Sequence, residues 1–89
     1  MGRNNILEFT IDCADLSSSR ELHLRLAKTL HFPEWYGCNL DALYDCLTSI
    51  NEDTHLFLSG FQASSPALRP FARVFSDVCR DNPHIRISF

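Results

Sequence analysis

Residues 33–48 read Pro33-Glu-Trp-Tyr-Gly-Cys-Asn-Leu-Asp-Ala-Leu-Tyr-Asp-Cys-Leu-Thr48, and they predict a loop followed by a helix. Pro33 ends any preceding helix, because proline disfavours helical geometry in the residue before it, and Gly37 loosens the segment further. Residues 32–38 are therefore predicted to form a loop rich in aromatic side chains. Asn39 is a good N-cap residue, so we expect a helix from there to about Ile50.

The expected helix has an apolar face and an acidic face. At roughly 100° per residue, five side chains fall in one sector that we expect to pack against a sheet: Leu40, Leu43, Cys46, Leu47 and Ile50. The opposite face carries side chains that follow the i, i+3, i+4, i+7 rule: Asp41, Tyr44, Asp45 and Thr48. No basic residue occurs between Cys38 and Ile50, so nothing local neutralises the two carboxylates. The acidic face is therefore suited to an external cation.

The same side chains also have ordinary structural interpretations. Asp41 lies near the helix N-terminus, where the helix dipole favours a carboxylate by ~0.3–1 kcal/mol, so both interpretations stay open. Asp45 lies a turn further in, where aspartate is a poor helix former and the dipole has faded, so a functional role is favoured. Tyr44 is either an isolated exposed aromatic or a binding residue, because tyrosine and tryptophan are enriched at interface hot spots. Trp35 and Tyr36 fit a lid over the core equally well.

Strands and helices follow one another along the rest of the chain. Apolar alternation and β-rich runs predict strands over residues 6–11, 54–58 and 85–89. Helical spacing predicts helices over residues 19–31 and 66–80, the first preceded by a capping box of Ser18 and Glu21. Residues 12–17 are expected to be a loop. Because strands joined through helices favour parallel pairing with right-handed crossovers, the order β-α-α-β-α-β predicts a small α/β layer fold with a parallel sheet.

Length and composition favour one domain over residues 1–89. A chain of this length with 45% hydrophobic side chains can bury a core, and a net charge of −3 is too small for a disordered chain. The same charge argues against a nucleic-acid binder, because such proteins neutralise phosphates with Lys and Arg. No apolar run approaches the ~20 residues that span a bilayer, and polar Asn4, Asn5 and Glu8 interrupt any secretory signal. We expect a cytoplasmic protein that binds neither nucleic acid nor membrane.

The cysteines and histidines predict neither a metal site nor a catalytic site. No Cys-x-x-Cys pair occurs, and a reducing cytosol would keep all four cysteines as thiols: Cys13, Cys38, Cys46 and Cys79. An enzyme would need Cys38 or Cys46 as nucleophile, but Cys46 falls on the predicted buried face and the surroundings of Cys38 are acidic. Acid–base chemistry by Asp41 and Asp45 would lack a pocket on a convex helix. We expect no catalytic residue, no metal and no cofactor.

Residues 33–48 closely resemble the corresponding segment of the barstar family, the inhibitors of the ribonuclease barnase. The resemblance extends more weakly to the whole chain through the same order of elements. It implies a single barstar-like domain, a three-stranded parallel sheet covered by helices. It also implies a non-enzymatic inhibitor, whose aromatic loop and second helix plug the active site of a ribonuclease while carboxylates take the positions of RNA phosphates.

The resemblance further implies which residues bind the partner. By motif position, Asp41 and Asp45 correspond to the two helix carboxylates, and Tyr44 to the ring between them. Trp35 corresponds to the loop aromatic. Asp77 stands where the family has another acidic contact, but it lies beside the apolar face of the last helix, so a solvated flank charge stays open as its interpretation. The predicted partner-binding residues are Trp35, Tyr36, Gly37, Asn39, Asp41, Tyr44, Asp45, Thr48 and Asp77.

Four departures from the family's pattern concern the partner. Barstar has tyrosine at the position of Trp35, tryptophan at Tyr44, glutamate at Cys38 and a longer acid at Asp77. These differences change the shape of the contact surface. We expect a monomer that binds one extracellular barnase-type ribonuclease, one to one. A related toxin nuclease, or another toxin, is the alternative partner, and an interaction module without inhibitory action is a third interpretation.

Overall fold

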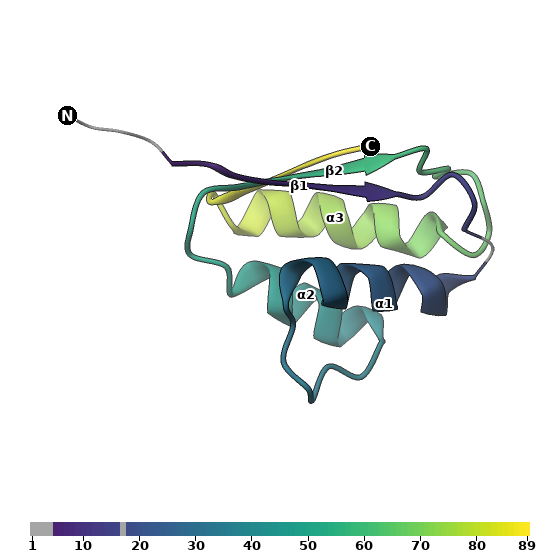
Figure 1. Cartoon of the computed structure of the whole chain (residues 1–89), viewed down its shortest axis with the longest axis horizontal. Coiled ribbons are helices and arrows are strands. Elements are labelled where there is room, and N and C mark those ends of the chain that lie inside the picture. The colour runs from purple at the N-terminus through teal and green to yellow at the C-terminus, as the bar shows by residue number, and fades with distance from the viewer. Residues whose placement is uncertain (1–4, 17) are drawn as a thin grey trace.

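The protein has six elements in the order strand, helix, helix, strand, helix, strand. A computed structural model describes residues 5–16 and 18–89, so Ser17 of the predicted loop and residues 1–4 lie outside the described residues. The elements are β1 (Leu7–Asp12), α1 (Ser19–Leu30), α2 (Leu40–Thr48), β2 (Thr54–Ser59), α3 (Arg69–Asp81) and β3 (Ile85–Ser88). The strands pair in parallel in the order β1-β2-β3, and the three helices lie on one side of this sheet (Figure 1). The predicted α/β layer fold is confirmed.

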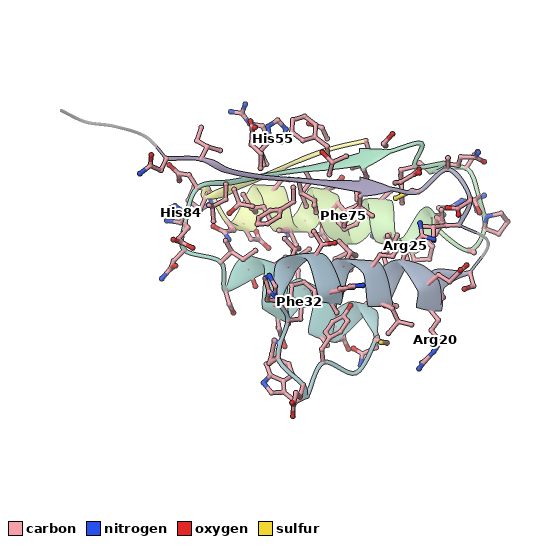
Figure 2. The ribbon with its side chains drawn as sticks, in the orientation of Figure 1. Arg20, Arg25, Phe32, His55, Phe75 and His84 are labelled. Carbon is pink, nitrogen blue, oxygen red and sulfur yellow. The ribbon has the colours of Figure 1, made fainter. Side chains whose placement is uncertain are left out.

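The register of the sheet separates a buried face from an open face. Leu56 of β2 pairs with Phe9 of β1 and Ile87 of β3, and all three side chains face the helices. The neighbouring residue His55 points to the opposite face, as Figure 2 shows. Its ring stacks on that of Phe57 with centroids 3.9 Å apart. The core therefore lies between the sheet and the helices only.

Helix α3 lies at the centre of the core. Phe71, Phe75 and Val78 are buried on its inner face, and Figure 2 shows Phe75 between the sheet and the other helices. The expectation that the apolar face of α2 packs against the sheet is wrong, because α2 packs chiefly on α3. Three strands span only about 10 Å, the width of one helix. Since α1 contacts β1 and α3 contacts β3, little of the sheet is left for α2.

The ends of the helices agree with the predicted capping residues better than with the predicted lengths. Ser18 caps α1, its Oγ accepting from the backbone N–H of Glu21 at 3.3 Å. Helix α3 begins at Arg69 and not at residue 66. Pro70 explains this difference, because it has no N–H to donate to the carbonyl four residues earlier. In the described part of the chain, no helix has the length and apolar character needed to cross a bilayer.

Candidate partner-binding surface

The aromatic loop 32–38 holds its two large side chains in different ways. Trp35 is 68% exposed, whereas Tyr36 is half-buried and packs edge-on against Phe32 with ring centroids 4.9 Å apart. Figure 2 shows Phe32 at the base of this loop. The Tyr36 hydroxyl also hydrogen-bonds Nδ1 of His23, which is buried in α1, at 2.5 Å. Tyr36 thus anchors the loop to the core, while Trp35 is presented to solvent.

Burial keeps the anchoring pair neutral. It raises the pKa of the Tyr36 phenol, and it lowers the pKa of the His23 imidazole. A neutral phenol and a neutral imidazole can share this hydrogen bond, because each offers one donor and one acceptor. The loop position therefore depends on a neutral hydrogen bond inside the fold.

The junction between the loop and α2 is fixed by three consecutive residues. Oδ1 of Asn39 accepts from the backbone N–H of Ala42 at 2.8 Å, which confirms the predicted N-cap. A Cβ atom at Gly37 would lie 3.0 Å from Nδ2 of Asn39, so a larger residue there would press on the cap. Cys38 takes the left-handed conformation with φ 54°. Gly37 and Asn39 therefore set where α2 begins and how it is aimed.

Asp41 and Asp45 form the acidic face of α2, and both are exposed. Among residues 5–16 and 18–89, neither carboxylate has an ion pair or a side-chain hydrogen bond. Thr48 is half-buried, and its hydroxyl donates to the Tyr44 carbonyl at 2.7 Å within the helix. The two carboxylates are thus free to meet a cation from outside.

Tyr44 does not stand among the exposed acids as the sequence predicted. Its side chain is half-buried against the core, and its hydroxyl donates to Oδ2 of Asp81 in α3. This hydrogen bond raises the pKa of the Tyr44 phenol. The reason is the packing of α2 on α3, which brings one flank of the acidic face onto α3 instead of leaving it in solvent.

A second acidic pair, Asp77 and Asp81, lies on α3. Arg80 is within reach of both: its Nε is 2.9 Å from Oδ1 of Asp81, and its Nη1 is 3.3 Å from Oδ1 of Asp77. Hydrogen bonds from Arg80 and then from Tyr44 lower the pKa of Asp81 to about 2. Sequence reasoning missed Asp81 and Arg80. The i, i+4 spacing from Asp77 to Asp81 was the available signal, since it places both on one face.

A hollow of about 240 Å³ lies beside the loop, and its walls include Phe32, Trp35, Cys46 and Ser49. The Cys46 thiol is buried there, and burial followed by the charge of Asp45 raises its pKa. A nucleophilic cysteine needs the opposite shift, because the thiolate is the reactive form. Within the described residues, no three His, Cys, Asp or Glu side chains are grouped to hold a metal ion. The surface thus presents carboxylates and aromatic rings.

The sequence of the chain matches one known protein family. The family model described as Barstar (barnase inhibitor) matches residues 6–87. The chain belongs to the barstar family. A protein of Bacillus subtilis (strain 168) named "Putative ribonuclease inhibitor YrdF" is 41% identical over 63 residues, which cover 70% of this chain and 69% of that protein. The resemblance drawn from residues 33–48 is confirmed, and the barstar match includes every predicted binding residue.

Proposed function

We propose that this barstar-family protein binds a barnase-type ribonuclease and blocks its active site with loop 32–38 and α2. One observation carries the proposal: the carboxylates of Asp41 and Asp45 are exposed on the helix that follows the loop of Trp35, and they have no ion pair among the described residues. An active site that cleaves RNA must hold phosphate groups with cationic side chains. Two carboxylates at helical spacing meet such cations as the phosphates do, but offer no bond to cleave.

The exposed aromatic side chain of the loop adds a second kind of contact. Trp35 can stack on an arginine or histidine of the partner, and a cation over an indole ring contributes about 0.5–2 kcal/mol. Tyr36 and Asn39 support this arrangement from below by anchoring the loop and capping α2. Gly37 of the loop and Thr48 at the end of α2 complete the proposed contact area. Inhibition then requires occupation of the active site and no chemical step by this protein.

The proposed biological setting is self-protection. The ribonuclease acts outside the cell, and the inhibitor stays in the cytoplasm, where it binds one molecule of the enzyme per monomer. Opposite charge steers such pairs together quickly, which matters when a toxic enzyme must be stopped before it cleaves cellular RNA. This role is that of an immunity protein.

Purified barnase is a suitable first probe. RNA cleavage by a fixed amount of barnase is measured while this protein is added, and calorimetry gives the stoichiometry of the complex. The proposal expects cleavage to fall linearly to zero at one equivalent. Full activity at a tenfold molar excess would contradict inhibition of a barnase-type enzyme.

A related toxin nuclease is the second candidate partner. The observation that favours it concerns the α3 acidic pair, which stands where the family has an acidic contact with its partner. In the free protein, Asp77 and Asp81 are already bound to Arg80, so a partner would meet a different surface there. A pull-down with the whole chain as bait, followed by an RNA-cleavage assay on each captured protein, separates the two candidates. A captured nuclease with a different active site would favour the second.

A further inference from the structure

Arg80 is the basic side chain of α3 that reaches the candidate surface, and it makes three hydrogen bonds to carboxylates. Its Nε and Nη2 donate to the two oxygens of Asp81 at 2.9 and 3.1 Å, and its Nη1 donates to Asp77 at 3.3 Å. The pair with Asp81 is bidentate, the geometry in which a guanidinium holds a carboxylate most strongly. The Tyr44 hydroxyl supplies a further donor to Asp81. Asp81 therefore has little capacity left for a cation from outside.

The two acidic pairs of the surface consequently differ in charge. Asp41 and Asp45 on α2 have no cationic partner among the described residues, whereas Asp77 and Asp81 share Arg80. The Arg80 side chain is 66% exposed, so its guanidinium is presented to an approaching partner. A partner meets free carboxylates at α2 and an arginine at α3. A uniformly basic surface would be attracted more strongly by the α2 pair than by the α3 pair, where the guanidinium cancels one of the two negative charges.

We propose that Arg80 is a specificity-determining residue of the docking surface. It cancels one of the two negative charges of Asp77 and Asp81 and occupies both oxygens of Asp81, and it thereby shifts recognition of the partner's cations toward Asp41 and Asp45. The inference rests on the proposed function, and it adds the kind of partner: a ribonuclease with clustered cations opposite α2 and an acceptor, a carboxylate or a carbonyl, opposite Arg80. A nuclease without that acceptor has to displace Arg80 or leave it facing a cation.

Arg80→Ala tests the inference, with Arg86→Ala as the matched control. Arg86 is exposed on the open face of β3, so its loss changes the net charge equally without touching α3. Arg80→Lys keeps the positive charge at the site. Association with purified barnase is followed by stopped flow at low salt. Arg80→Ala is expected to associate at least about threefold faster than Arg86→Ala, and Arg80→Lys about as fast as the wild type.

A second readout needs no partner. NMR titration of the Asp81 carboxyl should show its pKa rising in Arg80→Ala from about 2 toward the ordinary value of 3.8, and staying low in Arg86→Ala. Equal association rates for Arg80→Ala and Arg86→Ala would overturn the inference, as would an unchanged Asp81 pKa. Binding by Arg80→Ala alone would support it strongly. If none of the proteins binds barnase, the proposed function fails for that enzyme, and the Asp81 titration decides the role of Arg80.

Discussion

Asp45 differs from the other acidic residues of the surface in having neighbours that a partner would bury with it. It lies between Asp41 and Ser49 on the same row of α2, and Ser49 lines the hollow that Trp35 also borders. A partner that fills this hollow would also exclude water from Asp45, the residue next to Cys46 in its wall. The Asp41 carboxylate, one turn nearer the N-terminus, also interacts with the helix dipole. Among the acidic residues of the surface, Asp45 is thus the one that contributes least to the stability of the fold.

Asp45→Ala is expected to weaken binding of barnase far more than Asp41→Ala does. Truncating one partner of a desolvated charge pair costs about 2–5 kcal/mol, because it leaves the opposite charges buried and unpaired, a range to which measurements on barnase and barstar themselves contribute. The dissociation constants of both variants are compared with that of Glu8→Ala on the open face of the sheet. Urea midpoints should change little, since exposed substitutions alter stability by only ~0.5 kcal/mol. An Asp45→Ala complex within about threefold of wild type, under ~1 kcal/mol, would remove this residue from the centre of the interface.

At the scale of elements, the start of α2 depends on its cap. Asn39→Ala is expected to lower the free energy of unfolding by about 1 kcal/mol, because the Ala42 N–H loses its acceptor. Asn39→Asp is the control, since its carboxylate can accept the same hydrogen bond and suits the helix N-terminus. Urea unfolding of the three proteins measures the difference. Equal losses in both variants would mean that the cap does not stabilise the helix.

The elements also show how far the sequence predicts this molecule. Local signals succeeded: Ser18 and Asn39 cap their helices, and all three strands were found within one residue at either end. The partner of α2 was wrong, because helical periodicity shows that a face is buried but not against what. The start of α3 was placed three residues too early, at residue 66, because the missing N–H of Pro70 was not weighed against the apolar pattern.

The candidate site was predictable only where it depends on spacing within one helix. Asp41 and Asp45 follow from spacing within one helix, and their exposure agrees with that spacing. Arg80 was missed although its carboxylate partners lie within three positions of it on α3. Tyr44 was misplaced because its position depends on how α2 meets α3. Such contacts join residues more than thirty positions apart, and no local pattern encodes them. Their roles in binding stay predictions.

For the molecule as a whole, one buried histidine links stability to pH. Burial lowers the pKa of His23 below its usual value of 6.5, so below that pH the unfolded chain binds more protons than the folded one. The free energy of unfolding should therefore be largest above pH 6.5 and fall as the pH drops toward the folded-state pKa. Urea midpoints between about pH 7 and pH 5 measure this slope. His23→Gln should flatten it, whereas His31→Asn at an exposed position should not; equal slopes in all three proteins would exclude His23 as the cause.

Asp81 adds a second dependence of the free energy of unfolding on pH, in a more acidic range. Its pKa is lowered to about 2, so the stabilisation is complete above the ordinary value of 3.8 and is lost as the pH falls from there toward 2. The His23 window begins at pH 6.5 and the Asp81 window at pH 3.8, so variants of each residue distinguish the loop anchor from the α3 acidic pair. Arg80→Ala should reduce the loss of stability below pH 3.8 and leave the slope caused by His23 unchanged.

The whole charge distribution determines how the association rate depends on salt. The chain has a net charge of −3, and α2 carries two exposed carboxylates, Asp41 and Asp45, without an ion pair among the described residues, so a basic ribonuclease is attracted before contact. Salt shortens the reach of this attraction to ~8 Å at physiological strength. The association rate with barnase should therefore fall steeply as sodium chloride is raised, while dissociation, governed by pairs already desolvated, changes less. Asp41→Asn combined with Asp45→Asn should remove most of the salt dependence, and Glu8→Gln on the open sheet face should keep it. A wild-type rate that ignores salt would mean that the acidic face of α2 is not where the partner docks.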